Sequence, residues 1–420
     1  MTHASPRIVI VGAGHAGGSA AAFLRQFGHA GSIVVIGTEP HLPYQRPPLS
    51  KAYLKGVATV DSLLLRPAAY YADRDVELVT GCTVTTIDAT QRLVVTDDGR
   101  RLPYDVLILA TGSTARRLAV PGSELGGVHH LRDIADADAL RRHMAPGHRL
   151  AIIGGGYVGL EAAASARLLG AEAVIIEREP RLLARVAAAP LAEFFAAYHR
   201  AHGVEIITGA DVVRLEGRQG NVDAVILGDG RRIDCDAVLV GIGGQACDAL
   251  ALSAGIACDN GVVVDENART DDPHIYAIGD MTRRPLPLDD DRRHRLESVP
   301  NAIEQARRAA NSILDLPQPA HELPWFWSDQ YDLKLQIAGL PFDTDAIVVR
   351  GDPAVAKFAV YHLRGGQVRA VEAVNSIPDF MGGKALIASG RQVDPARLAD
   401  TTASIKALVS EVQASAQNLA

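Results

Sequence analysis

The sequence predicts an α/β fold in which two strand–loop–helix units of the same kind follow one another along the chain. Three observations support this prediction. A buried strand at residues 7–11 runs into the glycine loop G-A-G-H-A-G, a second strand at 150–153 runs into G-G-G-Y-V-G, and a similar hairpin segment follows each unit. Because 420 residues are too many for one ordinary core, we expect two or three domains.

The first glycine loop lies between the strand at 7–11 and a helical stretch that extends to Phe27. Glycine permits a tight turn at the first position of such a loop, close approach of a pyrophosphate at the second, and packing of helix on strand at the third. The helix N-terminus adds free N–H groups and a positive dipole. We therefore expect a nucleotide site, rather than a glycine-rich turn, on Gly12, Gly14 and Gly17.

The second loop has the same surroundings. It follows the strand at 150–153, precedes an alanine-rich helix over 160–169, and is succeeded by a strand at 173–176. This spacing predicts a second nucleotide site on Gly154, Gly156 and Gly159.

An acidic residue after the second strand of each unit is the candidate for binding the adenosine ribose. Glu177 follows directly on the strand at 173–176, where its carboxylate would accept bonds from both ribose hydroxyls and repel a 2′-phosphate. NADH is therefore favoured over NADPH, although Arg178 beside it weakens this preference. In the first unit two residues separate the strand at 32–36 from Glu39, which is the best candidate there.

The hairpin segment after each unit indicates an internal duplication. Residues 94–112 align without gaps with residues 225–243, and both share the run D-G-R-R. Each predicts a hairpin turned at Asp-Gly, then a polar step and a buried strand that ends in glycine. Hairpins often look alike, but four consecutive identical residues favour descent of both folds from one nucleotide-binding ancestor.

Two further segments indicate that the first loop holds FAD. The strand of the first hairpin ends in A-T-G, and I-Y-A-I-G-D at 275–280 predicts a buried strand that ends on an acid. Ligands bind at the carboxyl ends of parallel strands, and in two-dinucleotide flavoproteins such an acid holds the ribityl and pyrophosphate portion of FAD. The alternative is that Asp280 only caps the next helix. The residues expected to skirt the cofactor are Ala110, Thr111 and Gly112.

The order of these motifs resembles that of the pyridine-nucleotide-dependent flavin reductases of the glutathione-reductase superfold. Three finer segments are R-P-P-L-S-K at 46–51, L-E-S-V-P-N-A at 296–302 and P-W-F-W-S-D-Q-Y at 324–331. They look like those of the FAD-dependent ferredoxin reductases of bacterial oxygenase systems, the group of putidaredoxin reductase and the biphenyl-dioxygenase reductase component. The resemblance covers essentially the whole chain and weakens after residue 385.

The resemblance implies an α/β architecture with two Rossmann-like dinucleotide-binding domains, one for FAD and one for NAD, plus a C-terminal α/β domain. The FAD domain would be discontinuous, over residues 1–114 and 245–322, with the NAD domain inserted at 115–244. The C-terminal domain, residues 323–420, would contribute one wall near the flavin.

The resemblance also implies roles at the flavin. Lys51 and Glu161 would pair beside flavin N5, where a cation stabilises the anionic reduced ring; the alternative is a surface lysine and a first-turn glutamate favoured by the helix dipole. Tyr157 would cover the flavin until nicotinamide displaces it, or would only pack between domains. Arg46 and Pro47 would lie along FAD, Val299 would cap its ring, and Trp327 would lie against it rather than anchor a core.

The cysteines limit the redox chemistry. Superfold relatives that reduce disulfides carry a cysteine pair near residues 40–60, and peroxide-reducing relatives keep one, whereas the first cysteine here is Cys82. FAD would therefore be the sole redox centre, passing electrons to an external acceptor. The resemblance implies an NADH-dependent ferredoxin reductase that feeds a haem monooxygenase or a Rieske dioxygenase through a [2Fe–2S] ferredoxin. The alternatives are an NADH-responsive interaction protein similar to apoptosis-inducing factor and, less favoured, a membrane quinone reductase.

Composition and charge limit the partners. The net charge of −7 argues against nucleic acid, no apolar run is long enough for a membrane helix, and the tail at 402–420 lacks the basic and aromatic faces of an interfacial helix. The absence of a C-x-x-C pattern and of a signal peptide before residue 7 favours the cytoplasm. The histidines, His199 among them, match no metal spacing and suit ordinary surface roles. A monomer or weak dimer would dock ferredoxin on Arg292, Arg293, Arg295, Arg307 and Arg308.

Overall fold

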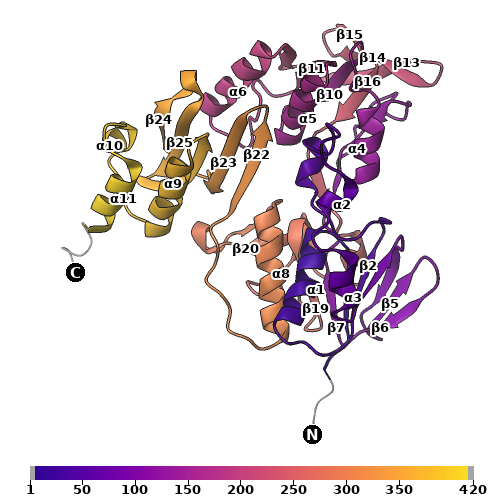
Figure 1. The fold of residues 1–420 in the computed structure, drawn as a ribbon. Coiled ribbons are helices and arrows are strands. Elements are labelled where there is room, and N and C mark those ends of the chain that lie inside the picture. Colours follow the sequence, from indigo (N-terminus) through magenta and orange to yellow (C-terminus); the bar gives the residue numbers. More distant parts are fainter. Residues whose placement is uncertain (1–4, 415–420) are drawn as a thin grey trace. The chain divides into compact units, whose positions relative to one another are not determined.

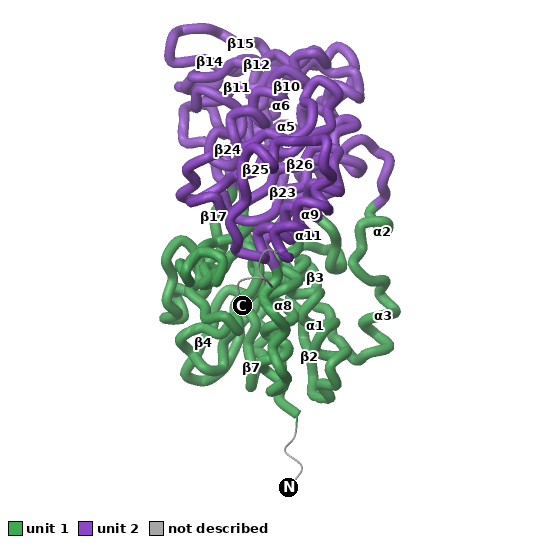
Figure 2. Tube along the Cα trace, turned by 90° about the vertical axis from the view of Figure 1, so that its left-hand side faces the viewer, with its two compact units in different colours: residues 1–46, 60–114, 244–322 green, residues 47–59, 115–243, 323–420 purple. Residues whose placement is uncertain are grey.

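The computed structural model describes residues 5–414, so the expectations for residues 1–4 of the N-terminal stretch and 415–420 of the tail lie outside the described residues. The chain divides into two compact units, coloured separately in Figure 2. Unit 1 comprises residues 1–46, 60–114 and 244–322, and unit 2 comprises residues 47–59, 115–243 and 323–420.

A five-stranded parallel sheet forms the centre of unit 1 (Figure 1). Ile8 pairs with both Ile33 and Val106, so the strand before the first glycine loop lies in the middle of the sheet. That strand is apolar and buried at every position, as parallel strands covered on both faces are. In sheet order the strands are β19 (Ile275–Ala277), β7 (Val106–Leu109), β1 (Ile8–Val11), β2 (Ile33–Gly37) and β3 (Val76–Thr80).

Two helices cover one face of this sheet. Helices α1 (His15–Gln26) and α8 (Val299–Ile313) pack against each other through alanines such as Ala20 and Ala306, both fully buried, because small side chains let helix backbones approach closely. The other face packs on a three-stranded antiparallel sheet of β4 (Val84–Asp88), β5 (Leu93–Thr96) and β6 (Arg101–Pro103).

Short elements complete unit 1. They are α2 (Val60–Leu63), α3 (Ala68–Ala72), β8 (Ser113–Ala115), β17 (Gly244–Ala246), α7 (Ala249–Ser253), β18 (Val262–Val263), β20 (Thr282–Pro285) and β21 (Arg293–His294).

Unit 2 repeats the same architecture with a second five-stranded parallel sheet. Its order is β12 (Val204–Thr208), β11 (Glu172–Glu177), β10 (Arg149–Ile153), β16 (Ala237–Val240) and β9 (Val128–His129). Its helices are α4 (Ile134–Arg141), α5 (Tyr157–Leu168) and α6 (Ala189–Ala201). The sheet β13 (Val212–Arg218), β14 (Asn221–Leu227) and β15 (Arg232–Asp234) corresponds to β4, β5 and β6, so the duplicated hairpins predicted from D-G-R-R are confirmed.

The C-terminal part of unit 2 is a five-stranded antiparallel sheet with helices. Gly383 lets α9 approach the sheet closely, because a Cβ there would meet Val371. The sheet order is β22 (Trp325–Gln330), β23 (Leu333–Gly339), β26 (Gln367–Val374), β25 (Lys357–Arg364) and β24 (Ala346–Asp352), and the helices are α9 (Ile377–Ser389), α10 (Pro395–Ala399) and α11 (Ile405–Ala414).

The predicted fold class is thereby confirmed: two Rossmann-like units and a C-terminal α/β region. Residues 47–59 group with unit 2, because Ser50 accepts a bond from Ser165 through its carbonyl (2.8 Å) and Tyr53 donates to Asp138 (3.0 Å). Within residues 5–414, no helix combines the length and apolar character that crossing a bilayer requires.

Candidate functional site

The first glycine loop fits a pyrophosphate. Gly12 has φ +115°, and a Cβ there would meet the Ala110 carbonyl oxygen, so the strand-to-loop turn requires glycine. Gly14 ends the loop as the residue before α1, and a Cβ there would meet open space. Neither a side-chain cap nor an acid in the first turn satisfies the first N–H groups of α1, as far as the described residues go. These groups remain available to an anion.

The second loop has the same geometry. Gly154 has φ +109°, and a Cβ there would meet the Gly241 carbonyl oxygen. Gly156 precedes α5, again with open space at its Cβ position and with no capping side chain among the residues that the structure describes. Gly17 and Gly159 occupy equivalent positions, since a Cβ on either would meet the carbonyl oxygen of the first glycine of its loop. Both glycine loops can therefore hold a dinucleotide.

The two candidate ribose acids are held differently. The Glu177 carboxylate accepts from the N–H of Gly155 (2.6 Å) and from the N–H of Glu179 (2.8 Å), which fixes it against the second loop. The Arg178 side chain is 72% exposed and pairs with Glu179 (3.3 Å). It does not pair with the Glu177 carboxylate in any contact that the structure gives.

In unit 1, Glu39 pairs with Arg46 (2.5 Å) and accepts a bond from the Tyr44 hydroxyl (2.5 Å). The structure thus brings together two residues that were expected at FAD for separate reasons. Tyr44 was missed by the sequence analysis, since no pattern distinguishes it.

The segments expected along FAD lie at the carboxyl edge of the unit 1 sheet. The Thr111 hydroxyl donates to the Cys247 carbonyl (2.7 Å), and Asp280 accepts from the Ser113 hydroxyl (3.2 Å). Asp280 lies inside the 3₁₀ turn Gly279–Met281, and Ser298 caps α8, so the alternative that Asp280 caps the next helix is wrong. Val299 is the first residue of α8 and is half-buried.

His15 is a further titratable group in the first loop that sequence reasoning did not single out. Burial, together with the nearby positive charge of Arg46, lowers the pKa of His15 to about 4, while Asp280 acts in the opposite direction. The imidazole is therefore neutral near pH 7. Its position in the loop, G-A-G-H-A-G, was the only available signal.

Lys51 and Glu161 form a buried ion pair. The distance from Lys51 Nζ to Glu161 Oε2 is 2.7 Å, and their side chains are 16% and 6% exposed. The Ser50 hydroxyl donates to the same carboxylate oxygen (2.5 Å), and the Ser328 hydroxyl donates to Oε1 (2.6 Å). A carboxylate removed from water is tolerated when it is paired and fully hydrogen-bonded.

The alternative reading of these two residues is wrong. Lys51 is not a surface residue, and α5 begins at Tyr157, directly after its capping glycine, so Glu161 is the fifth helical residue rather than a first-turn one. The helix dipole at the first turn therefore does not explain this glutamate.

Aromatic side chains lie close in sequence to Glu161 and to its hydrogen-bond partner Ser328. Tyr157 packs edge-on against Phe326, with 5.0 Å between ring centroids. Burial, and to a lesser degree the Glu372 carboxylate, raise the pKa of Tyr157 well above its usual value. Trp327 is half-buried on β22, and its ring lies 5.6 Å from that of Trp325.

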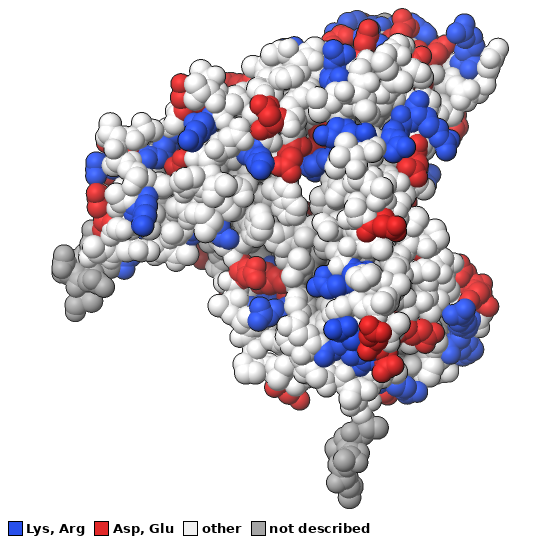
Figure 3. All heavy atoms as spheres, viewed as in Figure 1, with Lys and Arg blue, Asp and Glu red and all other residues white. Residues whose placement is uncertain are grey.

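The five arginines expected at a docking surface separate into exposed and covered residues. Arg308 is wrong for this role: it is 2% exposed and pairs with buried Glu304 four residues earlier on α8 (3.2 Å). Arg295 is largely covered and pairs with Glu297. Arg293 and Arg307 are exposed. Arg292 is half-exposed and pairs with Asp289 (2.6 Å). On the face drawn in Figure 3, basic and acidic groups are interspersed.

The surface role predicted for His199 is wrong, because its side chain is fully buried. It lies on α6, and its ring Nε2 is 2.8 Å from Gln330 Oε1.

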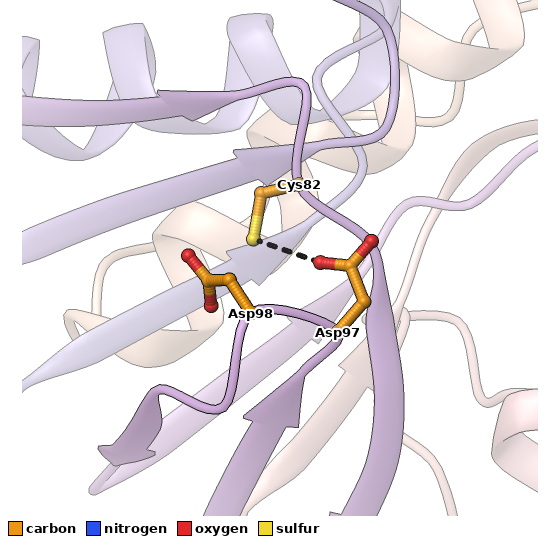
Figure 4. A group of neighbouring side chains, drawn as sticks. All are labelled: Cys82, Asp97 and Asp98. Atoms are coloured by element: carbon orange, nitrogen blue, oxygen red, sulfur yellow. Dashed lines mark hydrogen bonds between the residues drawn. The ribbon is translucent and has the colours of Figure 1, made fainter.

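Cys82, Asp97 and Asp98 lie close together in unit 1 (Figure 4), with ligand-type atoms within 4.8 Å of one another. The Cys82 thiol donates to Asp97 Oδ1 (3.6 Å), and burial raises the pKa of the thiol, which favours the protonated form that binds metals poorly. Both aspartates are exposed, and we assign the group no function. None of the four cysteines, all within the described residues, is in a disulfide.

Comparison with known proteins gives full-length matches. A family described as pyridine nucleotide-disulphide oxidoreductase matches residues 6–306, and one described as reductase C-terminal matches residues 325–409. The probable ferredoxin reductase CtmF of Castellaniella defragrans is 47% identical over 406 residues, covering 97% of this chain and 99% of that protein. Putidaredoxin reductase CamA of Pseudomonas putida is 40% identical, covering 98% and 99%. The crystal structure of the covalent putidaredoxin reductase–putidaredoxin complex matches with a TM-score of 0.95 at 40% identity, covering 98% of this chain and 100% of that one.

Proposed function

The chain belongs to the pyridine nucleotide-disulphide oxidoreductase family, and from this premise we propose that it is an NADH-dependent, FAD-containing ferredoxin reductase. The observation that carries the proposal is the pair of glycine loops. Each is followed by a helix whose first N–H groups have no capping side chain within residues 5–414, so one chain can hold two dinucleotides. Relatives aligned over almost the whole chain are named as ferredoxin reductases, which favours this function over an apoptosis-inducing-factor-like interaction role.

Unit 1 residues would hold FAD. Gly12, Gly14 and Gly17 would receive the pyrophosphate, with Glu39 at the adenosine ribose and Asp280 at the ribityl chain. When bound, FAD accepts a hydride from nicotinamide and releases electrons singly. The remaining residues proposed along the cofactor are Arg46, Ala110, Thr111, Gly112, Val299 and Trp327.

Unit 2 residues would hold NADH. Gly154, Gly156 and Gly159 would receive its pyrophosphate, and Glu177 would accept bonds from the ribose hydroxyls while disfavouring a 2′-phosphate. Tyr157 would cover the flavin until nicotinamide arrives, and the Lys51 ammonium would stabilise negative charge on the reduced flavin. We propose an FAD domain at residues 1–114 and 245–322, an NAD domain at 115–244 and a C-terminal domain at 323–420. Residues 47–59 belong to compact unit 2.

The electrons would leave to an external carrier. No cysteine precedes Cys82, so the segment at 41–51 offers no thiol for the disulfide chemistry of the family's name. One NADH would reduce two molecules of a [2Fe–2S] ferredoxin, with release of NAD⁺ and one proton, and the ferredoxin would supply a haem monooxygenase or Rieske dioxygenase. Four cysteines that form no disulfide in the described part of the chain suit a reducing compartment, and we infer a cytoplasmic location.

The test is reduction of cytochrome c by NADH or NADPH, with and without candidate [2Fe–2S] ferredoxins. A large increase that depends on both NADH and ferredoxin is the expected result. Fast flavin reduction without any ferredoxin-dependent increase would contradict the proposal, and slow flavin reduction with a long-lived charge-transfer complex would favour the interaction role.

The docking surface can be tested in the same assay. Arg293→Glu and Arg307→Glu should raise the KM for ferredoxin at low salt and flatten its salt dependence, because both side chains are exposed. Reduction of ferricyanide, which needs no docking surface, serves as the control. A ferredoxin rate that is insensitive to salt in the unmodified protein would remove these arginines from the proposal.

A further inference from the structure

A line of buried polar side chains within unit 2 runs from Glu161 to His199. Ser328 donates to Glu161 Oε1 (2.6 Å), Gln330 Nε2 donates to the Ser328 hydroxyl oxygen (3.1 Å), and Gln330 Oε1 lies 2.8 Å from His199 Nε2. Ser328 and Gln330 are each 1% exposed, and His199 is fully buried. Solvent therefore does not share these hydrogen bonds.

Three elements supply the line. Glu161 comes from α5, His199 from α6, and the two linking residues from β22. Ser328 and Gln330 are two residues apart, so they lie on the same face of the strand. The C-terminal sheet thus connects a histidine on one helix of the nucleotide-binding region to a glutamate on another.

The hydrogen bonds have one consistent direction. Because the Ser328 proton is given to Glu161, the serine oxygen can accept from the Gln330 amide, and the Gln330 carbonyl oxygen must then accept from an Nε2–H of His199. His199 Nδ1 is buried and has no hydrogen-bond partner among the described residues, so a second ring proton there would have no acceptor. Burial lowers the pKa of His199 to about 4, in agreement with a neutral ring.

The two oxygens of Glu161 are held from different sides. Oε2 pairs with the Lys51 ammonium and accepts a hydrogen bond from the Ser50 hydroxyl, whereas Oε1 accepts a hydrogen bond from the Ser328 hydroxyl. A carboxylate held at one oxygen only can rotate about its last bond. The Lys51 ammonium also donates to the Pro47 carbonyl (3.1 Å), so such a rotation would change the ammonium's distance from the carboxylate or draw it away from that carbonyl. Ser328 is the bond that opposes this rotation, and Gln330 and His199 orient its hydroxyl.

We propose that Ser328, Gln330 and His199 are positioning residues that fix the Glu161 carboxylate, and through it the Lys51 ammonium. This inference rests on the proposed role of Lys51 at the flavin. It goes beyond that role because residues of the C-terminal sheet and of α6 would then influence the rate of flavin reduction.

The experiment uses two pairs of variants in the FAD-loaded protein. His199→Leu and Ser328→Ala remove a donor, whereas His199→Gln and Ser328→Thr retain one. The readouts are the stopped-flow rate constant for flavin reduction by NADH and the midpoint potential of the flavin. We expect the first variant of each pair to lose about tenfold in rate, the lower end of what removing the hydrogen-bond partner of a metal ligand costs, and to shift the potential to more negative values. The second variant should restore most of both.

A double-mutant cycle separates positioning from packing. In a Glu161→Gln background, Ser328→Ala should have little further effect on rate or potential, since Ser328 acts through that carboxylate. Unchanged rate and potential in His199→Leu and Ser328→Ala, additive losses in the cycle, or equal losses in the donor-retaining variants would each overturn the inference. These readouts need only NADH and FAD, so a failure of ferredoxin reduction alone would count against the proposed function and not against the positioning role.

Discussion

Replacement of Lys51 by methionine tests the buried pair, because methionine keeps most of the apolar part of the side chain and lacks the ammonium. The ammonium also donates to the Pro47 carbonyl (3.1 Å), and that bond is lost as well. At 2.7 Å, with an effective dielectric constant of about 20, the attraction between the ammonium and Glu161 is about 6 kcal/mol. Most of this attraction energy only offsets the free-energy cost of removing both charges from water. Ser50 and Ser328 still donate to the carboxylate in the variant, so the loss should be below the roughly 3–5 kcal/mol of a fully broken buried pair.

We therefore expect Lys51→Met to lower the free energy of unfolding by about 2–3 kcal/mol. The matched control is Lys51→Met combined with Glu161→Gln, which buries neither charge and should regain most of the loss. Denaturant unfolding of the FAD-loaded proteins measures both. In stopped-flow experiments the single variant should also be reduced more slowly by NADH. A double variant less stable than the single one, or unchanged hydride transfer in Lys51→Met, would show that the buried charge pair has neither the energetic nor the functional role given to it here.

Three further predictions follow from the loops and from His199. Gly12→Ala should lose bound FAD, seen as a low flavin-to-protein absorbance ratio, because its Cβ would meet a backbone carbonyl oxygen at φ +115°; normal flavin content would contradict this. Glu177→Gln should raise the ratio of kcat/KM for NADPH to that for NADH by about tenfold, or about 1.4 kcal/mol, with FAD content as the control. The pKa of His199 is about 4 in the folded protein and about 6.5 in the unfolded chain, so between these pH values only the unfolded state binds this proton. The free energy of unfolding should therefore fall by up to about 3 kcal/mol as the pH falls from about 6.5 towards 4. His199→Gln should weaken this acid sensitivity in thermal unfolding at pH 5 relative to pH 7.

The local sequence pattern was sufficient to predict the two nucleotide-binding folds. The strand before each glycine loop and the Asp-Gly hairpins are set by residues adjacent in sequence, so β1, β10 and the paired hairpin sheets could be predicted. The resemblance was needed to associate Lys51 with Glu161, since 110 residues separate them and no periodicity links them.

The positioning residues could not be predicted in this way. Ser328, Gln330 and His199 meet Glu161 only through tertiary packing of a strand between two helices, and each is ordinary in its own segment. The burial of Arg308 was different, because Glu304 lies four residues earlier and an i,i+4 acid–base spacing on an alanine-rich helix was visible in the sequence.

The order of strands in the unit 1 sheet has a consequence for synthesis of the chain. Strand β19 pairs with β7, but the two strands are far apart in sequence. The ribosome finishes β7 at Leu109 and reaches Ile275 of β19 only after it has made all the strands from β9 to β16. At about 5–20 residues per second, the β7 edge would wait roughly 10–30 s for its neighbour. During that interval the hydrogen-bonding groups of β7 are open to other strands, which is the condition that favours aggregation. Yield of folded protein should therefore depend on translation speed and chaperone supply more than the stability of the finished sheet would suggest.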